Sequence, residues 1–346
     1  MERRRAVLVG AGGMGRTWAR NLLDCDQVEL VGWVDIRPEA AAEASAALGM
    51  PDLYVGPALG EALRVCRAGF VVDVSIPEAH HDVTLEALAA GLPVLGEKPM
   101  ADSMDRAREM VAAAERAGKL YMVSQSRRYH PALATLRDLI VAHLGPLGLL
   151  NTDFYLGPHF GGFRETMPSP LLLDMAIHTF DAARYLSGAD PVSVYCEEFN
   201  PPWSWYAGAS CAVALFEMSG GLRYTYRGGW AAEGRQTSWE AEWRAIGPGG
   251  TATWDGAEPP MAEVVVGKEG FFRPVEERRR PIPIWEHTGI AASLREFLST
   301  LETGATPMGE CHDNIKSLAM VFAAIESAAS GRRVAIRPYT HAIQEA

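Results

Sequence analysis

The stretch AVLVGAGGMG, residues 6–15, decides the fold of the first half of the chain. A compact apolar run is followed at once by the glycine pattern GxGxxG and then by a helix-like sequence at residues 16–23. In such a strand–loop–helix unit, Gly10 permits the tight turn, Gly12 lets the backbone approach a pyrophosphate, and Gly15 lets the helix pack closely on the strand. The N-terminus of the helix then offers N–H groups to the phosphates. The pattern predicts a dinucleotide site rather than a simple glycine-rich turn.

An acidic residue after the next predicted strand bears on the choice of dinucleotide. Asp35 follows the apolar run at residues 28–34 and lies 20 residues after Gly15, where a carboxylate can accept hydrogen bonds from the adenosine ribose. Its charge would repel a 2′-phosphate, which favours NAD. Arg37, two residues further on, could instead hold that phosphate. The sequence therefore favours NAD as the cofactor and leaves NADP open.

Strand and helix patterns keep alternating through the first half. In chain order, further predicted strands and helices lie at residues 69–76 (strand), 79–90 (helix), 93–95 (strand), 102–117 (helix) and 120–124 (strand). This alternation predicts an α/β protein with an N-terminal Rossmann domain, a doubly wound parallel sheet, over residues 1–125. Ligands of such sheets lie at the carboxyl ends of the strands, where the sequence places Gly10, Asp35, Ser75, Glu97 and Lys98. His80 and His81 begin a helix beside this crevice and could contact the cofactor or meet solvent.

The second half has a different pattern, with consecutive strands joined by short glycine turns. They lie at residues 192–196, 209–216, 221–226, 239–246 and 262–266. We expect a C-terminal α+β domain, residues 126–346, with a mainly antiparallel open sheet that binds substrate and mediates oligomerisation. One face of the sheet would carry helices, and the other, if bare, would need a partner subunit. The predicted helix at residues 313–330 is expected to pack back toward the N-terminal domain.

The sequence LLLDMAIHTFD, residues 171–181, is the strongest candidate for catalysis. Asp174, His178 and Asp181 are spaced i, i+4 and i+7, which puts them on one face of a helix. A histidine with an aspartate one turn earlier can transfer a proton near neutral pH, because the carboxylate orients the ring. The alternative is a polar helix face that meets water. Ligation of a metal by His178, Asp181 and His159 has no preformed tetrahedral spacing, so no metal is predicted.

Composition narrows the class of protein. A chain of 346 residues with 48% hydrophobic and 22% charged residues predicts a soluble protein of two domains. The net charge of -11 argues against nucleic acid or an anionic membrane as partner. Five scattered cysteines without CxxC spacing suit a reducing compartment, so we expect a cytoplasmic location. Trp203, Trp205 and Tyr206 could form a sugar-binding platform or, somewhat better, part of a subunit interface.

Taken together, these pieces resemble the glucose–fructose oxidoreductase / inositol dehydrogenase family (Gfo/Idh/MocA), over nearly the whole chain. The matching pieces are GAGGMG at residues 10–15, Asp35, GEKP at residues 96–99 and DMAIHTFD at residues 174–181. The segment IPEAHH at residues 76–81 is similar to the TPNxxH segment of the family. The predicted cofactor is NAD, with NADP as an alternative, and the predicted assembly is a homodimer or homotetramer formed through the C-terminal sheet.

The resemblance also implies roles for individual residues. Lys98 would reach both the nicotinamide ribose and the substrate, and Glu97 would lie beside the nicotinamide. His178 would be the acid/base, with Asp174 as its partner. The cofactor contacts implied in full are Gly10, Gly12, Gly13, Met14, Gly15, Asp35, Arg37, Ser75, Pro77, His81, Glu97 and Lys98. The substrate contacts implied are Lys98, Arg128, Tyr155, Asp174 and His178.

Elementary chemistry agrees with this assignment. Oxidation of a secondary alcohol needs a hydride acceptor and a base within reach of the hydroxyl. His178 with Asp174 would supply the base, and Lys98 would stabilise the developing alkoxide. We therefore expect an NAD(P)-dependent oxidoreductase acting on a sugar, sugar derivative or cyclitol. The alternatives are NAD-dependent redox-assisted elimination of a glycoside and a non-catalytic sugar-sensing relative.

Overall fold

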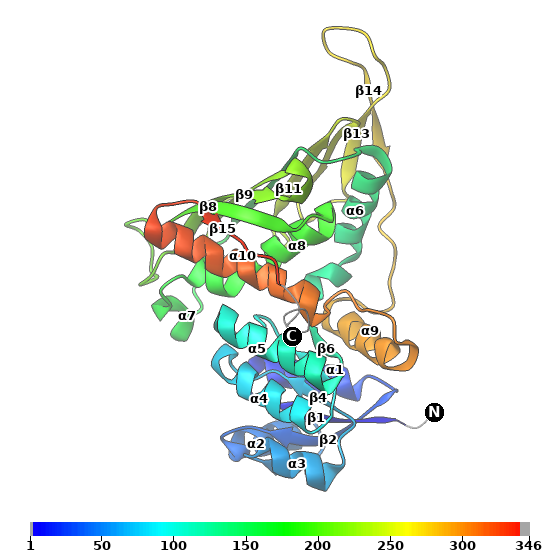
Figure 1. Cartoon of the computed structure of the whole chain (residues 1–346), viewed down its shortest axis with the longest axis vertical. Helices are drawn as coiled ribbons and strands as arrows, with labels where there is room; N and C mark the ends of the chain where they lie inside the picture. The colour runs from blue at the N-terminus through cyan, green and yellow to red at the C-terminus, as the bar shows by residue number, and fades with distance from the viewer. Residues whose placement is uncertain (1–2, 340–346) are drawn as a thin grey trace. The chain divides into compact units, whose positions relative to one another are not determined.

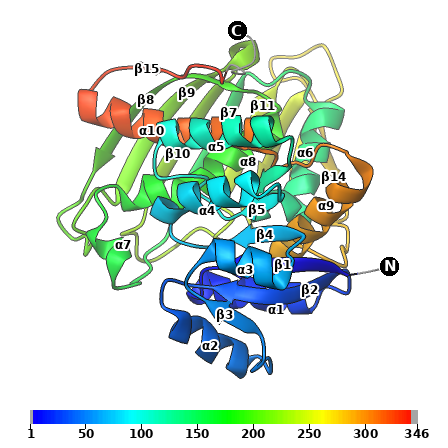
Figure 2. The same ribbon diagram turned by 60° about the horizontal axis from the view of Figure 1, so that its bottom comes forward.

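The apolar runs of the first half become the strands of a parallel sheet, in a computed structural model that describes residues 3–339 (Figures 1 and 2). The strands are β1 (Arg4–Val9), β2 (Val28–Val34), β3 (Tyr54–Gly56), β4 (Phe70–Asp73), β5 (Val94–Gly96) and β6 (Tyr121–Val123). Their order, β3-β2-β1-β4-β5-β6, is that of a doubly wound sheet and confirms the predicted class. Every residue of β4 and β5 is buried, as expected for parallel strands covered on both faces.

The helices of this sheet include two that were not predicted. The set is α1 (Gly13–Leu23), α2 (Pro38–Ala47), α3 (Leu59–Cys66), α4 (Pro77–Ala89), α5 (Met104–Ala117) and α9 (Gly289–Thr303). α3, α4 and α5 form a row of neighbours, and α1 packs beside α9. α2 could not be predicted, because it is largely alanine and carries little apolar patterning. α3 and β3 were also not predicted, although α3 has a clear apolar face.

The chain divides into two units. The first joins residues 3–126 to His287–Ile315 and Tyr339, and the second joins Arg127–Glu286 to Lys316–Pro338. The sequence assigned residues 287–315 to the second domain, whereas the structure groups them with the first. The reason is packing, since the ring of Phe297 on α9 lies 5.4 Å from that of Phe70 on β4. The expected packing of residues 313–330 on the N-terminal domain stays a prediction.

The second unit is built on a nine-stranded sheet in the order β14-β13-β12-β11-β7-β10-β9-β8-β15. The strands are β7 (Leu149–Tyr155), β8 (Pro191–Phe199), β9 (Cys211–Met218), β10 (Arg223–Gly229), β11 (Glu242–Gly247), β12 (Gly250–Trp254), β13 (Met261–Val265), β14 (Val275–Arg279) and β15 (Val334–Ala335). β7 and β10 pair in parallel, and the other pairings are antiparallel. This confirms the predicted mainly antiparallel sheet.

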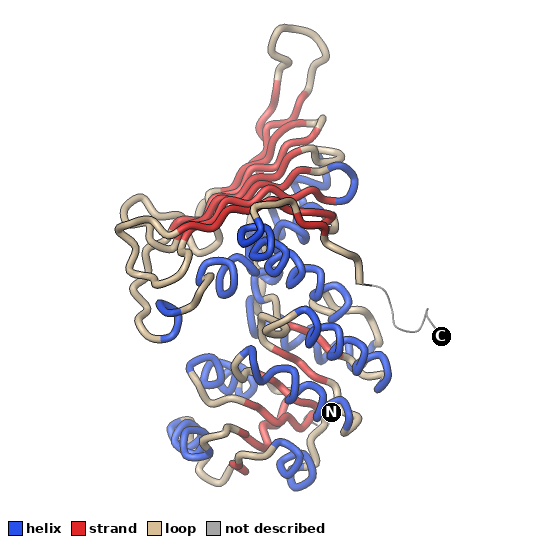
Figure 3. The backbone as a smooth tube through the Cα atoms, turned by 60° about the vertical axis from the view of Figure 1, so that its left-hand side comes forward, coloured by secondary structure: helices blue, strands red, loops and turns tan. Residues whose placement is uncertain are grey.

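Helices of the second unit lie along one face of this sheet (Figure 3). The helical segments are η1 (Ser126–Tyr129), α6 (Pro131–His143), α7 (Phe163–Thr166), η2 (Leu171–Ala176), α8 (Ile177–Ser187), η3 (Ser219–Gly221) and α10 (Cys311–Ser330), whose last part, from Lys316, belongs to this unit. Phe180 of α8 packs with its ring 4.9 Å from Phe216 and 5.2 Å from Tyr226. The backbone N–H of Cys196 donates to the Ser327 hydroxyl at 2.9 Å, which ties α10 to β8. The Phe180 contacts fix α8, the helix that carries His178.

Several side chains on the other face of the nine-stranded sheet are exposed. Val213 and Leu215 alternate with buried residues of β9 and are 44% and 39% exposed, and Tyr195 of β8 is 38% exposed. These three side chains form an apolar patch on a face that also carries the exposed Glu197 and Arg227. Exposed apolar patches rimmed by polar residues are typical of surfaces that a partner covers. Within residues 3–339, no helix combines the length and the apolar character needed to cross a bilayer.

Candidate active site

The glycine loop has the shape that a dinucleotide pyrophosphate requires. Gly10 has a φ of +100°, and a Cβ there would lie 2.5 Å from the carbonyl oxygen of Val74. A Cβ at Gly15 would lie 2.1 Å from the carbonyl oxygen of Gly10. At Gly12 and Gly13, a Cβ would meet no atom within 4 Å, so these positions border open space at the start of α1. The loop therefore fits a phosphate held by backbone N–H groups at a helix N-terminus.

Asp35 follows β2 and is held by two backbone N–H groups. Its Oδ2 accepts from the N–H of Ala11 at 2.7 Å, and its Oδ1 accepts from the N–H of Arg37 at 2.9 Å. The carboxylate is thus fixed beside the glycine loop, with lone pairs left for ribose hydroxyls. The side chain of Arg37 is exposed, and Met14 is 46% exposed in the first turn of α1. Contacts of these three residues with the cofactor stay predictions.

A buried network that was not predicted supports Ser75 at the end of β4. The Ser75 hydroxyl donates to Asp73 Oδ1 at 2.6 Å, and His80 Nδ1 lies 2.9 Å from Asp73 Oδ2. Burial alone would lower the pKa of His80, but the Asp73 carboxylate outweighs it, so the pKa of His80 is raised. Asp73 ends the apolar run GFVVD, and a buried acid in that position is the signal that could have revealed the network.

Two further predicted cofactor residues lie on α4. Pro77 is the first residue of the helix. His81 uses both ring nitrogens, because Nδ1 lies 2.7 Å from Asp82 Oδ1 and Nε2 lies 2.7 Å from Glu109 Oε2. A cofactor contact through the ring nitrogens of His81 would have to displace one of these carboxylates, and it stays a prediction.

Glu97 and Lys98 follow β5. Glu97 is 8% exposed; its Oε1 accepts from the indole N–H of Trp18 at 2.7 Å, and its Oε2 accepts from the backbone N–H of Lys98 at 3.0 Å. Burial raises the pKa of Glu97, and the Trp18 N–H opposes that rise. Lys98 is half-buried. The structure therefore brings Gly10, Asp35, Ser75 and Lys98 to the carboxyl ends of four strands of one parallel sheet, as the sequence predicted.

The helix predicted around His178 is present, but its first part is a π-helix. Asp174 lies in the π-helical segment η2 and His178 lies in the first turn of α8, and both are half-buried. π-Helical turns are rare and often occur at functional sites. The side chains of these two residues thus start from a helix whose winding changes between them, and the proposed acid/base pair stays a prediction.

Asp174 has an ion-pair partner that the sequence did not reveal. Arg164 of α7 donates from Nε to Asp174 Oδ2 at 2.7 Å. Its guanidinium carbon lies 5.1 Å from the ring centroid of Phe160 and 4.8 Å from that of Phe163. No motif marks Arg164, which stands in the glycine- and proline-rich loop at residues 157–169.

Asp181 has buried partners that the sequence did not reveal. It is 1% exposed and accepts from Arg128 Nε at 2.8 Å, from Arg128 Nη2 at 2.7 Å and from the Ser317 hydroxyl at 2.7 Å. The i, i+7 spacing assumed an α-helix throughout, whereas Asp174 lies in the π-helical segment η2, so a shared face stays a prediction. This buried pair gives Arg128 a structural role, and its substrate contact rests on the resemblance alone.

Tyr155, another predicted substrate residue, ends β7. Its backbone N–H donates to the Thr237 hydroxyl at 3.0 Å, and its carbonyl accepts from the Thr237 N–H at 2.9 Å. Burial raises the pKa of Tyr155, and the nearby Asp153 raises it further. The phenol is therefore protonated at neutral pH and can act as a hydrogen-bond donor.

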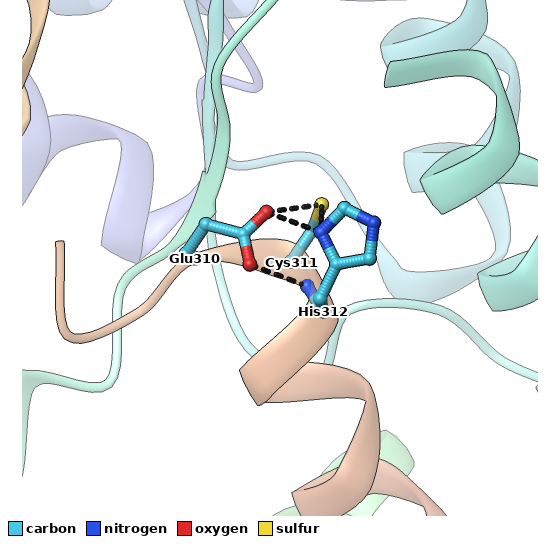
Figure 4. A group of neighbouring side chains, drawn as sticks. All are labelled: Glu310, Cys311 and His312. Atoms are coloured by element: carbon cyan, nitrogen blue, oxygen red, sulfur yellow. Dashed lines mark hydrogen bonds and ion pairs between the residues drawn. The ribbon is translucent and has the colours of Figure 1, made fainter. Parts of the chain in front are cut away.

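In the described part of the chain, one group of three side chains has ligand atoms close enough for a metal: Glu310, Cys311 and His312 (Figure 4). Its contacts are those of a helix start. Glu310 Oε2 accepts from the backbone N–H of His312 at 2.9 Å, and Glu310 Oε1 accepts from the Cys311 thiol at 3.0 Å. His312 also lies 2.9 Å from Glu115 on α5. His159, the third metal ligand considered in the sequence, instead pairs with Glu233.

Comparison with known proteins agrees with this geometry. Residues 4–125 match the family model described as "Oxidoreductase family, NAD-binding Rossmann fold", and residues 152–253 match "GFO/IDH/MocA C-terminal domain". The protein y4oX of Sinorhizobium fredii is 30% identical over 353 residues, which cover 97% of this chain and 96% of the relative. The D-apiose dehydrogenase of Paraburkholderia graminis is 26% identical, with 97% of this chain and 91% of the relative covered.

A solved structure shares the fold. The oxidoreductase of Agrobacterium radiobacter, in complex with NAD+, L-tartaric acid and magnesium, has a TM-score of 0.84 at 20% identity, covering 96% of this chain and 98% of that chain. The parallel sheet, the glycine loop and the family model together define an oxidoreductase with an NAD-binding Rossmann domain. The chain belongs to the Gfo/Idh/MocA family.

Proposed function

We propose that this oxidoreductase transfers hydride between NAD and a secondary alcohol of a sugar, sugar derivative or cyclitol. The observation that carries the proposal is the half-buried pair Asp174 and His178 on one helix, in a chain whose Rossmann sheet carries Lys98 at a strand end. The activity of the D-apiose dehydrogenase relative supports the substrate class. The fixed carboxylate of Asp35 supports NAD over NADP.

Each residue has a separate task in the proposed reaction. NAD, when bound, accepts the hydride from the alcohol carbon. The imidazole of His178 removes the hydroxyl proton, and the carboxylate of Asp174 stabilises the imidazolium that forms. The Lys98 ammonium donates a hydrogen bond to the developing alkoxide and so lowers the pKa of the alcohol. In the reverse direction His178 returns the proton.

The proposal extends to assembly and location. The exposed apolar residues of β8 and β9 support a homo-oligomer formed through the nine-stranded sheet. The five cysteines are free thiols, which supports a reducing compartment such as the cytoplasm.

A substrate panel tests the proposed activity. Sugars, sugar acids and cyclitols are each incubated with NAD or NADP, and the absorbance of reduced cofactor is recorded along with substrate loss. We expect stoichiometric NADH with at least one member and a preference for NAD. Substrate loss with release of a glycosidic group but without net NADH would replace the proposal with redox-assisted elimination. Binding without any turnover across the panel would favour a sugar-sensing protein.

A further inference from the structure

We infer that Arg164 binds an anionic group on the substrate, so that the substrate is an acidic sugar or cyclitol that carries a carboxylate or a phosphate. This inference rests on the proposed function, because it places Asp174 at the substrate. It concerns the second unit alone, where Arg164 and Asp174 form their ion pair.

Arg164 uses only part of its hydrogen-bonding capacity. Its Nε donates to Asp174 Oδ2 at 2.7 Å, while Nη1 and Nη2 donate to no residue in the described part of the chain. The side chain is 35% exposed. Arg128 shows the contrast, because it donates from both Nε and Nη2 to Asp181 and its side chain is only 7% exposed. Arg164 therefore keeps the end of its guanidinium available to a ligand.

The guanidinium is also held in place by aromatic rings. Its central carbon lies 5.1 Å from the Phe160 centroid and 4.8 Å from the Phe163 centroid, both within range of a cation–π interaction. Phe160 is itself fixed, since its ring centroid lies 5.4 Å from that of Trp230. An arginine ordered before binding loses less entropy when it binds a ligand.

The loop that carries Arg164 is anchored at both ends. Near its start, the carbonyl of Pro158 accepts from the Tyr206 hydroxyl at 2.9 Å and from the Trp205 indole at 3.3 Å. Near its end, the carbonyl of Pro168 accepts from the N–H of Ala209 at 2.9 Å. Trp205 and Tyr206, considered above as a sugar platform or an interface, thus hold the loop. They present Arg164 beside Asp174.

The chemistry of the free end selects an anion. The two terminal nitrogens of a guanidinium can donate in parallel to two oxygens of one carboxylate or phosphate, and a neutral hydroxyl cannot match this geometry or charge. The nearest acidic neighbour in sequence, Glu165, is turned to the backbone N–H of Gly161 at 2.8 Å. Asp174 compensates the charge of Arg164 when no substrate is bound, which explains why the cation is tolerated in the site.

The test compares matched substrates that differ only in charge. The sets are glucose, glucuronate and glucose 6-phosphate, and myo-inositol with a myo-inositol phosphate. kcat/KM for NADH formation is measured for the wild type, Arg164→Gln and Arg164→Lys. The control is Arg280→Gln, because Arg280 is an exposed arginine of the second unit that also pairs with an aspartate, Asp138. NADH binding and the melting temperature establish that each variant is folded.

We expect the wild type to favour one charged member over its neutral counterpart by at least ~10-fold in kcat/KM. Arg164→Gln should lower this charged-to-neutral ratio by ~10-fold or more, Arg164→Lys should retain part of it, and Arg280→Gln should keep it. The carboxylate and phosphate arms identify which anion is bound. A neutral sugar as the best substrate, or an unchanged ratio in Arg164→Gln, would overturn the inference.

A binding measurement separates this inference from the proposed function. Glucuronate and glucose 6-phosphate are titrated calorimetrically into the protein loaded with NADH, with wild type and Arg164→Gln in parallel. If no member of the panel reduces NAD, the proposed function fails, but binding of an acid that is lost in Arg164→Gln still supports the anion site. Turnover of neutral sugars, with acid binding that is absent or equal in both proteins, contradicts the anion site alone.

Discussion

Asp174 and Asp181 stand on one helical stretch and have different surroundings. Asp174 is half-buried beside the partly exposed Arg164, whereas Asp181 is 1% exposed and accepts from Arg128 and Ser317. Removal of one partner of a buried ion pair leaves an uncompensated charge, while an exposed pair contributes little. Substitution of Asp174 should therefore affect turnover, and substitution of Asp181 should affect stability.

Asp181→Asn should lower the free energy of unfolding by about 3–5 kcal/mol, because the Arg128 cation stays buried without its counter-ion. The matched control is Asp138→Asn, which breaks an exposed pair with Arg280 and should cost about 0–1 kcal/mol. Denaturant unfolding followed by tryptophan fluorescence measures both. Equal losses in the two variants would mean that Arg128 and Asp181 do not form the buried pair described here.

Glu198 makes stability depend on pH. Burial raises the pKa of Glu198 from its ordinary 4.5 to about 7, against the hydrogen bond that it accepts from Ser169. A carboxyl group with a raised pKa binds its proton more tightly in the folded state, so its contribution to stability is lost as pH rises from about 4.5 to about 7.

Glu198→Gln removes this titration. The variant should gain stability over the wild type with increasing pH, by about 1–3 kcal/mol at pH 8 relative to pH 5. Unfolding free energies at the two pH values measure the difference, in which groups common to both proteins cancel. If the stability difference between Glu198→Gln and the wild type were the same at both pH values, the raised pKa of Glu198 would be contradicted.

For individual residues, membership of a sequence motif determined whether a functional role could be predicted. Asp174, His178 and Lys98 stand in patterned segments, and the sequence singled them out as candidates. Arg164 could not be found, because its importance comes from an ion pair across a loop that no spacing rule describes. The role of Trp18 could not be predicted either, because only the structure shows that its indole N–H donates to Glu97.

The turn between β1 and α1 shows how an element depends on close approach. Gly15 lies where a Cβ would be 2.1 Å from the Gly10 carbonyl oxygen, while Gly13 borders open space. Gly15→Ala should therefore push α1 away from β1 and lower the stability of the cofactor-free protein by about 1–3 kcal/mol.

The matched variant is Gly13→Ala, in the first turn of the same helix. It should leave the melting temperature of the cofactor-free protein unchanged or slightly raised, because alanine restricts the unfolded chain. Thermal unfolding of both variants without NAD is the measurement. Destabilisation by Gly13→Ala as large as that by Gly15→Ala would refute the described turn.

Elements were predictable where burial imposes a pattern. The buried strands β1, β2 and β4 appear in the sequence as apolar runs. β14, VEERR, is almost wholly exposed and has no alternation to detect, and β3 and β15 are too short to show one. The π-helical winding of η2 was also beyond prediction, since the same residues suit an α-helix.

For the whole molecule, the exposed sheet face is the strongest expectation about assembly. Burial of the apolar residues of β8 and β9 by a second copy would remove their exposure to water.

The parallel sheet of the first unit and the mainly antiparallel sheet of the second were predictable from alternating and from consecutive strands. The assignment of residues 287–315 to the first unit was not predictable, because it depends on the tertiary contact of Phe297 with Phe70.

Leu215→Glu tests this assembly. We expect the wild type to be a dimer or tetramer by light scattering after size exclusion, and Leu215→Glu to shift it toward monomer, because a charge on the interface must be desolvated. The control is Val141→Glu on α6, an isolated residue that is 72% exposed and should leave the mass unchanged. A monomeric wild type, or a variant of unchanged mass, would contradict oligomerisation through the sheet.

The central claim is that Lys98 and His178 both serve the proposed hydride transfer. The most direct measurement is NADH formation by Lys98→Met with saturating NAD and the best substrate, compared with Lys268→Met, an exposed lysine. We predict that kcat falls about 100- to 1,000-fold in Lys98→Met, with NADH affinity largely retained, and that Lys268→Met matches the wild type. Undiminished turnover by Lys98→Met would contradict the claim.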